Sequence, residues 1–342
     1  MEKIILLLNW KLSKNSFWLQ QKLIDKGINV KVIGIPKFDR RNRYIKWRKV
    51  RLIIQYSILS IKGIKLARKQ NSVIISWSFF CGIITALLSS RQCNKVVALN
   101  MVVFEKSLLP KVLKNLFLEK IFSTKKIITT VNSNYLLNKY QFNYKIPPNH
   151  IHVLKDPWSP DYEKSIPNIY SGNYIFSGGE AARDWDMVLR IAEKLPQISF
   201  RIIARKNLWY TELPIPQNVQ VRFDAPKKEF YSEIKNSRFV ILPIKGKVTA
   251  GLTVLIRSVL LGKLVIATNT PSTQNYYPET CQELLVNQNS IKKFIELITL
   301  YWNSDHHLLN KSRELQRFIL DKYSPDKYTK KLIEIIKFAQ KN

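Results

Sequence analysis

The sequence predicts an α/β protein built from two doubly wound parallel sheets. The chain has 342 residues, and at roughly 150 residues per domain this length predicts about two domains. Apolar, β-branched runs alternate with helical patterns along both halves, which is typical of parallel sheets covered by helices. Apolar residues make up 46% of the chain and aromatic residues 11%, so each domain can bury a core and the composition is not that of a disordered protein.

In the first half, apolar runs predict five strands, and amphipathic stretches predict the helices between them. The strands are expected at 3–10, 28–35, 72–77, 94–100 and 125–133, with helices at 16–27, in the basic segment ending at Gln70, and at 83–90 and 109–122. The stretch 71–90 is uncharged, and its twenty residues are long enough for a helix to span a membrane. Ser78, Cys81 and Gly82 interrupt it, however, and favour a strand followed by a helix.

The second half repeats the alternation after a stretch rich in proline and turn-forming residues. Strands are expected at 173–179, 198–204, 219–223, 238–244 and 263–268, with helices at 185–192, 226–237, 252–260, 290–302 and 324–340. The predicted domains are an N-terminal domain at 1–157, a linker at 158–172, a C-terminal domain at 173–323, and a final helix at 324–342 that packs back toward the N-terminal domain.

The excess of basic residues is concentrated in the first half. The formal charge is +32, and residues 1–150 hold 28 basic and 5 acidic side chains, with no acidic residue between Asp39 and Glu105. Basic residues mixed with aromatic ones bind anionic membranes or nucleic acid, although a solvated helix face is the simpler alternative. Because no nucleic-acid motif is present, we expect an anionic membrane surface as partner and no nucleic acid, with docking through Arg40, Arg41, Arg43, Lys46, Trp47, Arg48, Lys49 and Arg51.

Cysteine, histidine and the N-terminus give no sign of a disulfide framework, a metal site or a secretion signal. The three cysteines and four histidines lack metal-ligand spacing. The N-terminal apolar run is too short for a signal peptide, so a cytoplasmic protein is expected. Asp184 and Asp186 flank Trp185, whose place in an apolar helical stripe argues against a metal-binding carboxylate pair. We expect neither a metal nor a cofactor.

Two glycine-containing turns in the second half are candidates for binding an anion. Gly178 and Gly179 end one predicted strand, shortly before Arg183. After another strand, Gly251 begins a helix. Glycine lets a ligand approach the backbone, and a guanidinium suits phosphate. The two turns predict a diphosphate held between them, with two unrelated loops as the alternative.

The same stretches resemble a known family. Residues 174–204 and 239–271 are similar to the donor domain of GT-B glycosyltransferases, closest to the retaining, family-4-like group, and 125–158 resembles the end of its acceptor domain, including Asn132 and Ser133. The resemblance covers nearly the whole chain and is strongest from about 125 to 285. It implies two Rossmann-like domains facing across a cleft, and transfer of a sugar from a nucleotide diphosphate sugar.

The resemblance also implies roles for individual residues. Arg183 and Lys247 would stabilise the departing diphosphate, and Glu105 would be the base if the enzyme inverted configuration. Arg257 replaces the family's ribose-binding carboxylate, although a guanidinium cannot accept hydrogen bonds from ribose. Thr249 replaces the family's first paired glutamate. The expected donor-binding residues are Gly178, Gly179, Glu180, Lys206, Lys245, Thr249, Gly251, Leu252 and Arg257.

The leading hypothesis from the sequence is a peripheral glycosyltransferase at the inner face of the membrane. It would transfer a sugar from a nucleotide sugar to a glycolipid or saccharide acceptor, in polysaccharide biosynthesis. The replacements at Thr249 and Arg257 keep a second hypothesis open, a catalytically degenerate GT-B scaffold that binds a membrane or a partner. A nucleic-acid-binding protein is the third.

Overall fold

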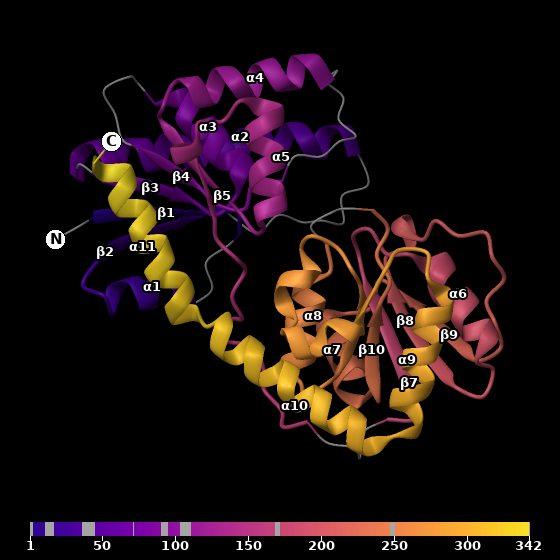
Figure 1. The fold of residues 1–342 in the computed structure, drawn as a ribbon. Coiled ribbons are helices and arrows are strands. Elements are labelled where there is room, and N and C mark those ends of the chain that lie inside the picture. The colour runs from indigo at the N-terminus through magenta and orange to yellow at the C-terminus, as the bar shows by residue number, and fades with distance from the viewer. Residues whose placement is uncertain are drawn as a thin grey trace. The chain divides into compact units, whose positions relative to one another are not determined.

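The computed structural model describes residues 3–10, 17–35, 45–70, 72–89, 95–102, 111–167, 172–246 and 250–341, with only the backbone at 45–49 and 111–114. The chain divides into two compact units (Figure 1). Unit 1 comprises Met1–Pro157 and Pro325–Asn342, and unit 2 comprises Trp158–Ser324. Residues 158–167, which begin the predicted linker, therefore belong to unit 2.

Unit 1 contains a six-stranded parallel sheet in the order β2-β1-β3-β4-β5-β6. The strands are β1 (Lys3–Leu8), β2 (Asn29–Gly34), β3 (Val73–Ser76), β4 (Val96–Ala98), β5 (Ile127–Val131) and β6 (Ile151–Val153). The helices are α1 (Trp18–Ile24), α2 (Ile45–Gln70), α3 (Phe79–Leu88), α4 (Lys111–Ser123), α5 (Asn134–Tyr144) and α11 (Pro325–Lys341). The first five strands were predicted from the sequence, and β6 was not.

Helices cover both faces of this sheet, as its unbroken apolar strands require. Successive residues of β1 point to opposite faces, so Ile5 and Leu7 join a core with α2, α3, α4 and α5. Ile4, Leu6 and Leu8 instead join a core with α1 and α11. The last helix of the chain therefore completes unit 1, lying beside α1 (Figure 1).

The uncharged stretch 71–90 forms β3 and α3, which confirms the strand-helix interpretation. Gly82 of α3 lies so close to β4 that a Cβ atom there would be 2.4 Å from the Cβ of Ala98. Thr85 of α3 shares a hydrogen bond of 2.8 Å with Ser60 of α2. These contacts hold α3 against a sheet and a second helix. Over the described residues, no helix is both long and apolar enough to cross a bilayer.

Unit 2 contains a second six-stranded parallel sheet, in the order β12-β11-β10-β7-β8-β9. Its strands are β7 (Tyr174–Gly179), β8 (Ser199–Ala204), β9 (Val219–Phe223), β10 (Phe239–Leu242), β11 (Val265–Thr268) and β12 (Leu285–Val286). Its helices are α6 (Trp185–Lys194), α7 (Lys227–Asn236), α8 (Leu252–Leu260), α9 (Ile291–Asn303) and α10 (Asp305–Lys322). The sequence did not predict β12 or α10.

The strand order of unit 2 places a switch point between β7 and β10. From β7 the chain winds to β8 and β9 on one side, and then returns to β10, β11 and β12 on the other. In open parallel sheets, the crevice beyond the carboxyl ends of two such strands is the usual position for a ligand. The residues that follow β7 and β10 therefore lie beside the expected ligand position.

Candidate functional site

Arg183 lies at the switch point of unit 2, where it joins the ends of β7 and β10. Its guanidinium donates from Nε to the carbonyl of Gly178 at 2.8 Å and from Nη1 to the carbonyl of Ala181 at 3.2 Å. Its backbone forms an isolated bridge with Ile244, just beyond β10. The side chain is only 8% exposed, so backbone carbonyls and packing fix its position.

The guanidinium carries its charge without a carboxylate partner in the described part of the chain. Burial lowers the pKa of Arg183 to about 10, so the group remains protonated at neutral pH. Its Nη2 atom has no hydrogen-bond acceptor among the described residues. A buried cation without a counter-ion is costly, which indicates a site arranged for an anionic ligand.

The two glycine turns of the sequence prediction meet at this guanidinium. Gly179 has φ +130°, and a Cβ atom there would lie 2.4 Å from Nη2 of Arg183. Gly251 has φ +84°, and its Cβ position is 3.4 Å from Nη1 of the same residue. Both glycines adopt a conformation that other residues rarely adopt. At Gly179 a side chain would take the space of Arg183, whereas at Gly251 it would first meet Ile244, at 2.9 Å. Gly251 and the buried Leu252 begin α8.

The carboxylates near Arg183 belong to the start of α6. Asp184 caps this helix by accepting a hydrogen bond from the backbone N–H of Met187. Asp186 lies 2.9 Å from Nζ of Lys245, and hydrogen bonds from Thr211 and Lys245 hold the pKa of Asp186 below its usual value. Both carboxylates at the start of α6 therefore have partners within unit 2.

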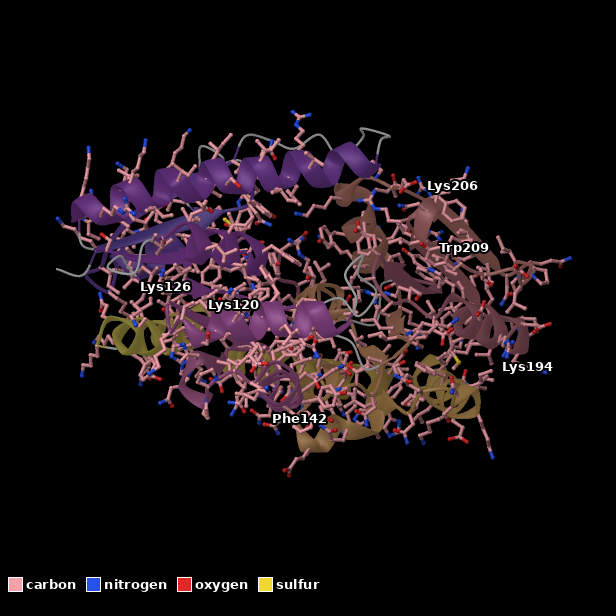
Figure 2. The ribbon with its side chains drawn as sticks, turned by 90° about the horizontal axis from the view of Figure 1, so that it is seen from above. Lys120, Lys126, Phe142, Lys194, Lys206 and Trp209 are labelled. Carbon is pink, nitrogen blue, oxygen red and sulfur yellow. The ribbon has the colours of Figure 1, made fainter. Side chains whose placement is uncertain are left out.

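Glu180 and Lys206 lie at the carboxyl edge of the same sheet, beside β7 and β8. Nε of Arg205 donates to Glu180 at 2.8 Å, and Asp224 lies 3.3 Å from the same guanidinium. These contacts raise the pKa of Arg205, Glu180 contributing most. Lys206 begins a short 3₁₀ turn and is exposed near Trp209 (Figure 2). Glu180 is thus held by a neighbouring arginine.

Arg257 is held between two tyrosine rings. Its guanidinium carbon lies 3.7 Å from the ring centre of Tyr162 and 4.0 Å from that of Tyr231. Burial, followed by the charge of Arg257, lowers the pKa of Lys227 nearby. Arg257 therefore has aromatic partners that stabilise a cation.

Several predicted residues lie outside the described part of the chain. These are Lys247, Thr249, Glu105, Arg40, Arg41 and Arg43. Lys46, Trp47, Arg48 and Lys49 lie within α2, where only the backbone is described, and Arg51 follows them as an exposed side chain. Their predicted roles stay predictions.

Unit 1 presents a carboxylate that the sequence analysis missed. Asp156 follows β6, and burial raises its pKa to about 6, partly offset by a hydrogen bond from Asn132 at the end of β5. Asn132 is buried, yet its Oδ1 atom has no hydrogen-bond partner among the described residues. Burial raises the pKa of Tyr328 of α11, and the nearby charge of Asp156 adds to this rise. In the sequence, the only sign of this carboxylate's environment is that Asp156 follows β6, a strand that was not predicted.

The described residues contain no cluster of three or more histidine, cysteine, aspartate or glutamate side chains that could hold a metal ion. Asp184 and Asp186 are used instead by a helix cap and by Lys245.

Comparisons with known proteins identify the architecture. No family model and no curated protein sequence matches the chain. Solved structures do match over nearly the full length of both chains. A glycosyltransferase from Rickettsia africae has 15% identity and a TM-score of 0.67, with 100% of this chain and 99% of that chain covered.

Two further structures agree with this match. Anabaena HepE, solved with UDP and glucose, has 10% identity and a TM-score of 0.67, with 98% of this chain and 99% of that chain covered. Sucrose-phosphate synthase from Thermosynechococcus elongatus has 10% identity and a TM-score of 0.72, with 98% of each chain covered. The chain therefore has the GT-B glycosyltransferase fold, as the sequence predicted.

Proposed function

We propose that the protein is a glycosyltransferase that binds a nucleotide diphosphate sugar in unit 2 and transfers the sugar to a saccharide or glycolipid acceptor. The observation that supports this most is the buried Arg183 guanidinium between two glycine turns at the switch point of the sheet. Solved structures of the same fold include one in complex with UDP-glucose. A diphosphate is the ligand whose charge and shape suit this position.

The proposed chemistry assigns Arg183 an electrostatic role. The bond between the anomeric carbon and the diphosphate oxygen breaks, and the acceptor oxygen forms the new bond to that carbon. Negative charge develops on the departing diphosphate, where a fixed guanidinium in a buried site stabilises it more than water would. Lys247 is the second proposed cation. In the retaining course that we propose, a phosphate oxygen of the donor receives the acceptor's proton.

The remaining parts of the donor site are proposed from their places in the fold. Gly178, Gly179, Gly251 and Leu252 would bring backbone N–H groups to the phosphates, and Lys245 would lie at the edge of the sugar pocket. We also propose that the donor contacts Glu180, Lys206, Thr249 and Arg257. Because Arg257 cannot accept hydrogen bonds, ribose recognition here would depend on other groups. No metal or cofactor is proposed for the reaction.

We further propose a peripheral location on the inner face of an anionic membrane, where a glycolipid acceptor would be available. This proposal rests on the basic character of unit 1, with 28 basic and 5 acidic side chains in residues 1–150. Anionic lipid attracts such segments by about 1 kcal/mol for each basic residue near the surface.

The test is a panel of nucleotide sugars incubated with the purified full chain, with release of nucleoside diphosphate as the readout. We expect one donor to release its nucleoside diphosphate. An added acceptor saccharide should increase this release, and Arg183→Gln should abolish it. Binding of nucleoside diphosphate without any turnover would favour the degenerate scaffold. No turnover and no binding across UDP, GDP and ADP would reject the proposal for unit 2.

A further inference from the structure

Helix α2 carries an exposed row of large aliphatic side chains that the sequence analysis did not single out. Ile53 is 58% exposed and Ile54 is 53% exposed. They belong to a set that lies on one helix, Val50, Ile53, Ile54, Ile58 and Ile61, all with relative exposures of at least 44%. We call this set the α2 aliphatic row. Scattered single apolar residues are ordinary on a protein surface, whereas a contiguous row marks an interaction site.

Helical geometry places the row on one side of α2. At 3.6 residues per turn, its five members fall within an arc of about 140°, and the row extends about 16 Å along the axis. Tyr56, Leu59 and Ala67 lie on the other side, where they are buried in the core of unit 1. In Figure 2, α2 lies along one edge of unit 1, with side chains pointing outward from it. Both sides of the helix are therefore apolar, although only one packs on the sheet.

Basic side chains accompany the α2 aliphatic row along one side. Arg51, Lys62, Lys65 and Lys69 are exposed, and by the same geometry they lie at one margin of the row or within it. Helix α2 as a whole contains eight basic residues and no acidic residue. An aliphatic strip bordered by cations is the pattern of a helix that lies in the interfacial region of an anionic membrane.

From this placement, we infer that the α2 aliphatic row inserts into the outer part of an anionic lipid leaflet, with the flanking lysines on the lipid head groups. This inference deepens the proposed membrane location, and it is independent of the donor site in unit 2. It moves the centre of the contact from the basic segment 40–51 toward residues 50–69. Electrostatic attraction would bring the helix to the surface, and burial of the isoleucines would hold it there.

The charge of α2 argues for lipid over the other two occupants. A symmetric contact between two copies of this helix would place eight basic residues against eight more, which is unfavourable without acidic partners. A nucleic acid would neutralise the charge, but it offers no apolar surface to five aliphatic side chains. An anionic leaflet satisfies both features of the helix.

The experiment measures binding of the full chain to vesicles of phosphatidylglycerol and phosphatidylcholine, against pure phosphatidylcholine, at about 0.15 M salt. The test variant combines Ile53→Ser with Ile54→Ser, and we expect its affinity for anionic vesicles to fall at least about tenfold. The matched control combines Ile24→Ser in α1 with Ile215→Ser in the loop before β9, two residues of similar exposure outside α2, and should bind like the wild type.

A second measurement covers the case in which the serine variant is unstable. In a Cys93→Ser background, Ile54→Cys is labelled with an environment-sensitive fluorophore, because Cys81 and Cys281 are buried. Anionic vesicles should shift its emission to the blue, and Ile215→Cys should show no shift. Nucleotide-sugar turnover measured without vesicles should be unchanged in the isoleucine variants, so a failure of this inference is separate from a failure of the proposed enzyme.

Three results would overturn the inference. The first is equal vesicle binding by the wild type and the Ile53→Ser, Ile54→Ser variant, with no emission shift at position 54. The second is a dimer of the wild type that the same variant converts to a monomer, which would make the row an interface between copies. The third is preferential binding of RNA over anionic vesicles at the same salt concentration, which would assign the basic helix to nucleic acid.

Discussion

Replacement of Arg183 by glutamine should separate the ligand-binding role of this side chain from its structural role. The wild-type guanidinium makes two hydrogen bonds to backbone carbonyls, each worth about 1.5–3 kcal/mol when the donor is charged. Its burial lowers the pKa to about 10, which corresponds to a cost of about 3 kcal/mol. Glutamine removes that cost and can keep one of the two bonds.

The structural gain and loss in Arg183→Gln therefore nearly cancel, and we expect the free energy of unfolding to change by no more than about 2 kcal/mol. The effect on ligand binding should be larger. Removal of one partner from a buried, hydrogen-bonded charge pair costs about 2–5 kcal/mol, which is a loss of affinity of at least about 30-fold. Titration calorimetry with UDP, GDP and ADP measures this loss, and chemical denaturation measures the stability.

The matched control is Arg238→Gln, at the amino end of β10. Arg238 also donates to a backbone carbonyl, that of Trp302 at 2.8 Å, and pairs with Asp305 at 2.5 Å. Its replacement should reduce stability and leave nucleotide affinity unchanged. The reasoning about Arg183 would be refuted if the folded Arg183→Gln protein bound nucleoside diphosphate within about threefold of the wild type, a difference of less than about 1 kcal/mol.

Three further predictions concern other parts of the two units. Gly179→Ala places a Cβ atom 2.4 Å from Arg183 at φ +130°, so it should cost about 1–3 kcal/mol of stability, measured by denaturation. It should also weaken nucleotide binding, measured by calorimetry, and unchanged binding would contradict this prediction. The fold raises the pKa of Asp156 to about 6, so its contribution to stability is greatest below about pH 4 and is lost as the pH rises through 6. Asp156→Asn should therefore be more stable than the wild type at pH 8 by at most about 3 kcal/mol and show no such gain at pH 4, whereas a pH-independent difference would refute the assignment. Asp184 caps α6 and Asp186 binds Lys245, so EDTA should not alter nucleotide affinity. Asp184→Ala should cost about 1 kcal/mol of stability, because the helix loses its cap. A nucleotide affinity that requires Mg²⁺ and is lost in Asp186→Asn would show that these carboxylates bind metal.

The strands of both sheets were largely predictable because they are buried on both faces. Apolar runs such as 72–77 and 263–268 differ clearly from their surroundings. The strand β6 has only three residues and lies in a stretch rich in turn-forming residues, so local pattern could not reveal it. Helix α10 begins with polar residues and carries many charges, and its helical state depends on packing against α8 and α9.

The candidate site was predictable where it depends on the backbone. The glycine turns and the nearby arginine can be recognised in the sequence. Because a parallel sheet brings the carboxyl ends of β7 and β10 together, the two turns were expected to lie close to each other. The side-chain partners were not visible. The aromatic contacts of Arg257 come from Tyr162 and Tyr231, which are distant in sequence. The environment of Asp156 likewise depends on Asn132 and on the last helix of the chain.

The most direct test of the proposed donor site is hydrogen–deuterium exchange of the full chain with and without nucleoside diphosphate. The proposal predicts that the ligand slows exchange of backbone amides at 178–184 and 250–253, on both turns around Arg183. It also predicts no such protection at these segments in Arg183→Gln at the same ligand concentration. Protection confined to unit 1, or protection at both turns that is equal in Arg183→Gln, would contradict the assignment of these turns and Arg183 to the diphosphate.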